Sequence, residues 1–374
     1  MRIAGLTVTA ALVGLVVSTQ AQAPASAPRT SGATARQATA KPSAIPRTAD
    51  GHPDFQGNWT NATITSMERR VNGPLALTEE AARLEESNTA ADLEARDAPK
   101  PDRGAPPVGG EVPKSPNGEP SYLEQLWRGG GGTVGGYNTF WIAPGDKVLR
   151  VDGQPRSSII IDPPNGRLPA YTPAAQARIA AAAELRRSKG GEFDHPELRP
   201  NAERCITSFG NNAGPPMLPN YFYNNSYTIV QSKDTVMILT EMVHDARIVR
   251  MNGTHPPAGT RKWFGDSIGR WEGDTLVIET TNFHPNHGFR SSWENLKVTE
   301  RLSRKDAKTI DYRFTVEDPS TFAAPFTGEL VFNAMAPGEM VYEYACHEAN
   351  YGLEGVLSGA RAQEREAAKK KTQQ

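Results

Sequence analysis

The stretch WEGDTLVIETT, residues 271–281, contains the pattern from which we predict the fold. Its Glu-Gly-Asp sequence is typical of a tight turn, and the run Thr275–Thr281 is rich in β-branched residues, as strands are. Seven other runs of strand length flank it, separated by turns rich in Gly, Pro, Asn and Asp. They are Ser226–Gln231, Val236–Met242, Ala246–Met251, Val298–Leu302, Thr309–Val316, Thr327–Phe332 and Val341–Cys346. This spacing predicts an antiparallel meander.

About eight such strands can close into a barrel whose interior holds one small ligand. We therefore predict a mainly β fold, an antiparallel up-and-down barrel of the calycin or lipocalin type with peripheral helices. A β-sandwich is the alternative. The segment Gly265–Asp274 is expected to form tight turns, with Trp271 packed against the core, because it is rich in Gly, Asp and Ser.

The first 21 residues have the features of a secretory signal peptide: one arginine, a short apolar run and small residues before a cleavage site near Ala21 or Ala23. An N-terminal membrane anchor is the alternative, but the apolar run is shorter than the roughly 20 residues that a span needs. Residues 22–49 are rich in Ala, Pro, Ser and Thr and predict a flexible tether. We expect the protein to be periplasmic or secreted.

After the tether, we expect residues 50–200 to form a mixed α/β segment that packs on the barrel. Residues 201–360 would form the barrel core, and residues 361–374 a charged tail. Two helices are predicted in the first segment. One begins after Thr78 and runs to about Asp97, and the other covers Tyr171–Lys189, with Thr172 as its N-cap and Pro173 in its first turn.

The 374-residue chain has a net charge of −1, which gives no reason to expect nucleic acid as a partner. No later stretch predicts a membrane span. We expect a small-molecule substrate or ligand and no cofactor, and the sequence leaves the oligomeric state open. The two cysteines, Cys205 and Cys346, most simply form a disulfide in an oxidising compartment, and a catalytic or metal-binding thiol is the alternative.

The last predicted strand, with the residues after it, concentrates groups that can carry chemistry. Strand alternation places Glu343 and His347 on one face, and Tyr344, Cys346 and Glu348 on the other. So many polar groups beside a structural cysteine predict the wall of a polar cavity.

A second polar cluster lies around residues 241–247, where one predicted strand ends and the next begins. The predicted catalytic residues of the two clusters are His347, His244, Glu241, Glu343, Arg247 and Tyr344. A histidine would transfer a proton, a glutamate would orient it, the arginine would stabilise an anion and the tyrosine would donate a hydrogen bond. Two alternatives are a structural network of ion pairs and a metal site formed by His244, His347 and Glu241, although no local motif requires a metal.

Polar and aromatic residues near these clusters are predicted to contact the substrate: Asn282, Trp293, Tyr351, Asn350 and Glu348. Aromatic rings beside polar groups can stack on a sugar or another ring. We therefore predict an exported enzyme that applies metal-free acid–base chemistry, as a lyase, isomerase or hydrolase, to a ring-containing, partly polar molecule. The alternatives are a non-catalytic lipocalin-like protein for a sugar-like or apolar ligand, and a protein that docks a partner in the cell envelope.

Several segments together resemble a large group of exported bacterial proteins of unknown function. The matching residues are Asp50–Trp59, Ser157–Arg167 (SSIIIDPPNGR), Glu203–Cys205, Glu241–Ile248 (EMVHDARI), Gly265–Phe283, Glu317–Pro319 and Tyr342–Gly352 (YEYACHEANYG). These segments are spread over nearly the whole chain after the tether. The resemblance implies one integrated exported domain, and it carries no activity and no catalytic residues.

Overall fold

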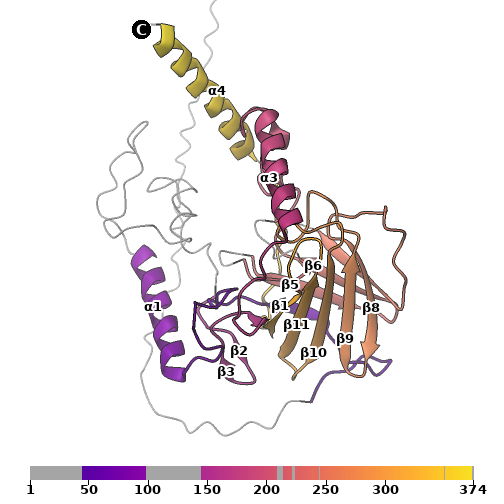
Figure 1. The fold of residues 1–374 in the computed structure, drawn as a ribbon. Coiled ribbons are helices and arrows are strands. Elements are labelled where there is room, and N and C mark those ends of the chain that lie inside the picture. The colour runs from indigo at the N-terminus through magenta and orange to yellow at the C-terminus, as the bar shows by residue number, and fades with distance from the viewer. Residues whose placement is uncertain are drawn as a thin grey trace, which may run out of the picture. The chain divides into compact units, whose positions relative to one another are not determined.

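The computed structural model describes residues 44–97, 145–208, 214–220, 224–243, 245–348 and 350–372. Within these ranges, nine strands form a closed ring (Figure 1), because β1 pairs with both β5 and β12. The strands are β1 (Gly57–Thr60), β5 (Ser226–Gln231), β6 (Thr235–Thr240), β7 (Ala246–Met251), β8 (Asp266–Glu272), β9 (Thr275–Thr281), β10 (Lys297–Arg304), β11 (Thr309–Glu317) and β12 (Phe326–Ala334). The prediction of a mainly β barrel is confirmed, and three of its strands have the predicted bounds.

The barrel is mixed, because one pair of neighbouring strands is parallel. β7 and β8 pair in parallel, with Val249 opposite Ser267 and Met251 opposite Gly269, whereas the other neighbours in the ring are antiparallel. A parallel pair cannot be joined by a tight hairpin. The connection of residues 252–265 instead carries the chain back to the end of the barrel from which β7 started.

The strand β8 occupies residues that we expected to form turns. Gly269 lies where an added Cβ would come within 2.7 Å of Met251 Sδ and 2.9 Å of Val249 Cγ1. Gly269 therefore allows β8 to approach β7 closely, and it does not mark a turn. The turn prediction holds only at Gly273-Asp274, where Gly273 has a φ of +60° and β8 passes into β9. Trp271 packs against the core as predicted.

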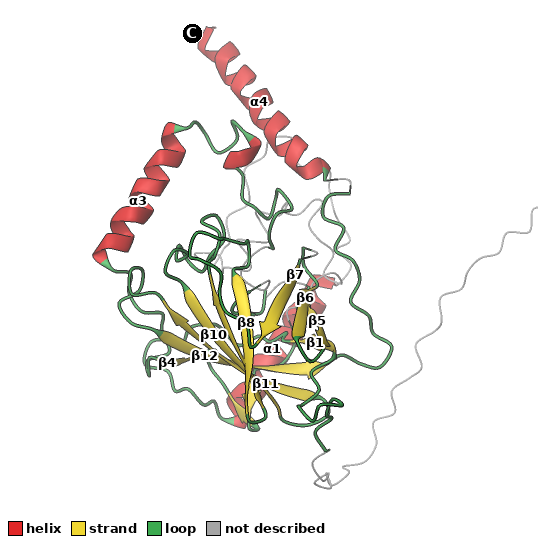
Figure 2. Cartoon of the chain, turned by 90° about the vertical axis from the view of Figure 1, so that its right-hand side faces the viewer, coloured by secondary structure: helices red, strands yellow, loops and turns green. Residues whose placement is uncertain are grey.

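Three α-helices occur in the described ranges: α1 (Glu79–Asp97), α3 (Pro173–Ser188) and α4 (Tyr351–Thr372). The two predicted N-caps are confirmed. Thr78 Oγ1 accepts a hydrogen bond from Ala81 N, and Thr172 Oγ1 accepts one from Ala175 N, both at 3.1 Å. In Figures 1 and 2, α3 and α4 lie outside the ring of strands, so they leave the barrel interior to side chains.

Smaller elements complete the described structure. The short strand β4 (Ile160–Asp162) pairs with β12. β2 (Arg150–Val151) and β3 (Gln154–Pro155) form a separate hairpin, and η2 (Pro196–Leu198) is a single 3₁₀ turn. None of the helices in the described ranges has the length and apolar character to cross a membrane.

The predicted strand Val341–Cys346 is wrong, since residues 341–346 pair with no strand. The edge of β12 that this segment would have joined is taken by β1 and β4. The expected signal peptide, and residues 22–43 of the expected tether, lie outside the described residues.

The interior of the barrel is filled by large side chains that are less than 2 % exposed, among them Tyr227, Tyr312, Phe314 and Phe332. Burial alternates along the strands, as it does for strands with one face toward a core. In β10 this alternation buries Val298, Glu300, Leu302 and Arg304. The barrel therefore has no wide empty lumen at its centre, and its chemistry lies toward its two ends.

Candidate functional site

The ionisable side chains of residues 341–348 lie mostly at the surface of the described structure. Glu343, His347 and Glu348 are exposed, and Tyr344 is half-buried. Without strand pairing, the expected division into two faces has no physical basis. One prediction for this segment is confirmed: Cys346 forms a disulfide with Cys205, which lies 141 residues earlier in the sequence.

The predicted substrate contacts are spread over several parts of the molecule. Asn350 Nδ2 donates to Glu203 O at 3.1 Å, and the Tyr351 side chain is 75 % exposed at the start of α4. Asn282 Nδ2 donates to Pro256 O at 3.1 Å, and the Trp293 ring lies beneath the guanidinium of Arg261. Asn350, Asn282 and Trp293 therefore each contact a different residue of the protein.

Arg247, the predicted anion-stabilising residue, is buried and already has a counter-charge. Both of its terminal nitrogens contact the carboxylate of Glu300 on β10, with Nη2 to Oε1 at 3.0 Å. Glu241, the expected partner, instead accepts a hydrogen bond from Ser226 N at 3.2 Å. Residue His244 lies outside the described residues.

Two tyrosines and an asparagine surround this ion pair, and we call the five residues the buried cluster: Asn61, Tyr227, Arg247, Glu300 and Tyr312. Tyr312 Oη donates to Glu300 Oε1 at 2.8 Å, and Asn61 Nδ2 donates to Tyr227 Oη at 3.3 Å. All five side chains are nearly inaccessible to solvent.

The protonation states in the buried cluster follow from its burial. Burial would lower the pKa of Arg247, but the adjacent charge of Glu300 outweighs it and raises the pKa. Burial raises the pKa of both Tyr227 and Tyr312 above the ordinary value of a tyrosine. Near neutral pH Arg247 is therefore charged, and the two phenols are neutral and can donate hydrogen bonds.

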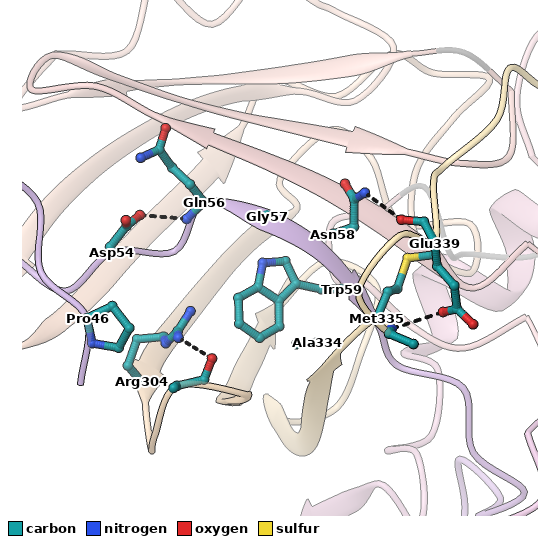
Figure 3. A pocket seen from close by; sticks show the side chains of 12 residues that line it. Pro46, Asp54, Gln56, Gly57, Asn58, Trp59, Arg304, Ala334, Met335 and Glu339 are labelled. Carbon is teal, nitrogen blue, oxygen red and sulfur yellow. Dashed lines mark hydrogen bonds between the residues drawn. The ribbon is translucent and has the colours of Figure 1, made fainter. Parts of the chain in front are cut away.

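A hollow lies at one end of the barrel, and we call it the Trp59 hollow (Figure 3). Its volume is about 390 Å³. It is lined by Pro46, Asp54, Gln56, Gly57, Asn58, Trp59, Arg304, Ala307, Ala334, Met335, Ala336 and Glu339. These residues come from β1 and the segment before it, from the ends of β10 and β12, and from the loops that follow β10 and β12.

The floor of the hollow is an arginine stacked on an aromatic ring. The guanidinium of Arg304 lies 4.6 Å from the centre of the Trp59 ring, and Trp59 Nε1 is tied to Phe55 O at 2.9 Å. Arg304 Nε donates to Asp306 O at 3.1 Å, and its Nη2 donates to Ala307 O at 2.8 Å. Burial lowers the pKa of Arg304 from its ordinary value. The stack holds a cationic, planar donor group against the open space.

Amides and carboxylates form the rim of the hollow. Asn58 Oδ1 accepts from Thr228 Oγ1 at 2.8 Å, and Asn58 Nδ2 donates to Glu339 O at 3.4 Å. The Glu339 carboxylate accepts from Ala336 N at 3.0 Å, and Asp54 Oδ1 accepts from Gln56 N at 2.9 Å. These bonds orient the groups around the opening (Figure 3).

The lining of the hollow suits binding better than proton transfer. It includes neither histidine nor cysteine, the side chains that most readily change charge or attack near neutral pH. Among the described residues, no group of three or more His, Cys, Asp or Glu side chains is arranged to hold a metal ion. The arrangement offers hydrogen-bond donors, acceptors and short apolar surfaces around a space of ligand size.

The sequence reasoning missed Glu300, Trp59 and Arg304 as functional candidates. A signal for two of them was present in KVTERLSR, residues 297–304, where alternation places Glu300 and Arg304 on the same face as Val298 and Leu302. Two charges on an otherwise apolar face predict buried partners.

No protein-family model, curated protein or solved structure matches the chain. The resemblance to exported bacterial proteins therefore stays a prediction from the motifs. A functional conclusion has to come from the geometry of the barrel ends.

Proposed function

We propose that the protein is an exported, non-catalytic binding protein that holds a polar, sugar-like small molecule in the Trp59 hollow. The observation that carries this proposal is the hollow of about 390 Å³ above the Arg304–Trp59 stack. Pockets for small ligands are typically about 300–1,000 Å³. The hollow falls near the lower end of this range and suits a compact ligand.

The chemistry of the lining indicates the ligand class. Arg304, Asn58 and Gln56 have planar polar groups that can pair with neighbouring hydroxyls, and Asp54 and Glu339 add acceptors. Apolar groups on Pro46, Ala334 and Met335 can contact the C–H face of a ring. Because the hollow contains charges of both signs, a neutral ligand with many hydroxyls fits it better than an ion.

A metal-free acid–base enzyme has less support. That function needs His347 and Glu343 in a shared cavity, whereas both side chains are exposed. Its anion-stabilising arginine is neutralised by Glu300. Export is supported by the disulfide and by the leader-like first 21 residues, and a periplasmic or secreted location is part of the proposal. We also propose that the protein is related to the calycins, because its barrel is closed and has a hollow at one end.

The test is calorimetric titration of the purified protein with a panel of mono- and oligosaccharides, with each ligand recovered afterwards and checked for chemical change. We expect saturable binding of at least one neutral sugar to the unaltered chain. Arg304→Met should abolish the heat of sugar binding, because it removes the hydrogen-bond donor group at the floor of the Trp59 hollow. Arg301→Met is the matched control, since Arg301 lies three residues away on β10 and pairs with Glu272 on the surface.

Two outcomes would overturn the proposal. Equal binding by the Arg304→Met and unaltered chains would place the ligand elsewhere. Conversion of a sugar or another panel compound by the unaltered chain would restore the enzyme hypothesis, and the His347→Ala variant would then show whether that histidine transfers the proton.

A further inference from the structure

A short segment, residues 214–220, packs against the buried cluster, and we call it the strap. Its central side chains, Met217 and Leu218, are almost completely buried and belong to the hydrophobic core. Both ends of the strap are also held. His287 hydrogen-bonds the backbone of Gly214, and Asn220 N donates to Asn225 Oδ1 at 2.6 Å.

The barrel holds the centre of the strap through the strap's main chain. Met217 N donates to Tyr312 Oη at 2.9 Å, and Asn61 Nδ2 donates to Met217 O at 3.2 Å. Tyr227 Oη donates to Leu218 O at 3.5 Å. The side chains of Asn61, Tyr227 and Tyr312 thus form hydrogen bonds with the main chain of the strap. The side chains of Met217 and Leu218 fill the space beside these bonds. This is how binding sites for extended peptides work: main-chain bonds supply affinity and pockets supply specificity.

The strap satisfies this site incompletely. Arg247 Nε and Asn61 Oδ1 are both buried and have no hydrogen-bond partner in the described structure. Buried polar atoms without partners are uncommon and cost free energy. Asn61 also holds the strap through Met217 O, so its free acceptor lies within the site. An occupant that supplied a donor to Asn61 Oδ1 would gain a hydrogen bond that the strap does not make.

We propose that this end of the barrel is a binding site for an extended peptide, occupied in cis by the strap and open to a competing peptide from another protein. The competitor would place two apolar residues where Met217 and Leu218 lie. It would also carry an amide or hydroxyl side chain that donates to Asn61 Oδ1. This site is separate from the Trp59 hollow, and sugar binding does not depend on it.

The first test replaces the strap with a flexible Gly/Ser segment of equal length in the full chain. A synthetic peptide, GPPMLPN, copied from residues 214–220, is then added in trans. We expect saturable one-to-one binding and a higher melting temperature. The matched control is the same peptide with an N-methylated methionine, which cannot donate to Tyr312 Oη and should bind about tenfold more weakly. A folded, strap-replaced chain that does not bind the peptide would overturn the proposal.

A second measurement uses the unaltered protein and decides the question even if the strap-replaced chain does not fold. Hydrogen exchange at the Met217 amide is compared with exchange at Ile278, in the centre of β9. A displaceable strap opens without global unfolding, so the Met217 amide should exchange at least about tenfold faster. Exchange at both amides with the same dependence on denaturant, through global unfolding alone, would mean that the strap is a fixed part of the core.

Discussion

The two ends of the barrel each contain an inward-facing arginine, and they satisfy it in different ways. At the Trp59 hollow, Arg304 stacks on an aromatic ring and donates to two main-chain carbonyls. Next to the strap, Arg247 is enclosed and pairs with the carboxylate of Glu300. Both residues are buried, with Arg304 7 % and Arg247 5 % exposed. Carbonyl dipoles and the face of a ring stabilise the first guanidinium, whereas a full counter-charge offsets the desolvation cost of several kcal/mol at the second.

The largest effect should come from breaking the ion pair at the strapped end. Glu300→Leu leaves the Arg247 charge buried without a partner, and we expect it to lower the free energy of unfolding by roughly 3–5 kcal/mol. Urea denaturation with the disulfide intact measures this. The double variant Arg247→Met, Glu300→Leu should recover most of the loss, since it removes both charges. Equal losses in the single and double variants would mean that packing, and not charge, dominates at this end.

Removing the disulfide should have the next largest effect. The bond joins the chain that leaves the Trp59 hollow to the segment that leads into the strap, and it closes a long loop. Replacing both Cys205 and Cys346 by serine should lower the free energy of unfolding by about 2–4 kcal/mol. Measuring both ends of the barrel sharpens the comparison. Hydrogen exchange at the Met217 amide should become faster, while sugar binding should stay unchanged. Loss of sugar binding instead would show that the bond supports the hollow.

Tyr312→Phe tests how much the barrel gains from holding the strap. The variant leaves Met217 N buried without its acceptor and removes the donor to Glu300, so we expect a loss of about 1–3 kcal/mol. Tyr171→Phe is the control, because Tyr171 Oη donates to Arg290 O at an exposed position. Guanidinium denaturation should show almost no change for the control. Similar losses in both variants would argue against a special role for the strap contact.

The two tyrosines of the strapped end should make the protein sensitive to alkaline pH. Burial raises the pKa of Tyr227 and Tyr312 in the folded state, so the folded chain holds these protons more tightly than the unfolded chain. Their contribution to stability is complete below about pH 10, the ordinary pKa of tyrosine, and is lost as the pH rises above it. Denaturation curves from pH 8 to 11 should show this decline. The decline should be shallower in Tyr312→Phe, and an unchanged slope would contradict the assignment.

The smallest effect on stability is expected at the hollow. Arg304→Lys keeps the charge but loses the planar group that stacks on Trp59, and we expect a loss of no more than about 1 kcal/mol. The same variant should still weaken sugar binding, because the donor geometry changes. If Arg304→Lys lowered the free energy of unfolding as much as Glu300→Leu does, the two arginines would contribute equally to stability. That result would contradict the difference between the two ends of the barrel.

Local features of the fold were predictable because they depend on residues close in sequence. The strand bounds at Ser226–Gln231, Ala246–Met251 and Thr275–Thr281, and the two threonine N-caps, follow from propensity and short-range hydrogen bonding. The strand β8 was missed because Asp266–Glu272 has few apolar residues and a glycine. Its place in the sheet comes from pairing with two neighbours.

The candidate site was less predictable than the fold. The residues around Cys346 were singled out for their density of ionisable groups, but residues 341–346 form no strand, and Glu343, His347 and Glu348 are exposed. Arg247 was identified as important, yet its partner Glu300 lies 53 residues away on a strand that is not its neighbour. A contact across the interior of a barrel leaves no periodic signal in the sequence.

By itself, the sequence determined the mainly β character, most strand positions, the helix caps and the pairing of the only two cysteines. These depend on backbone preferences, on alternation along one strand and on the absence of any competing thiol. The tertiary structure alone decided the parallel β7–β8 pair, the closure of β12 on β1, the Arg247–Glu300 pair and the hollow above Trp59. Each of these joins segments far apart in the chain, and their free energy comes from burial and pairing that exist only once the ring has closed.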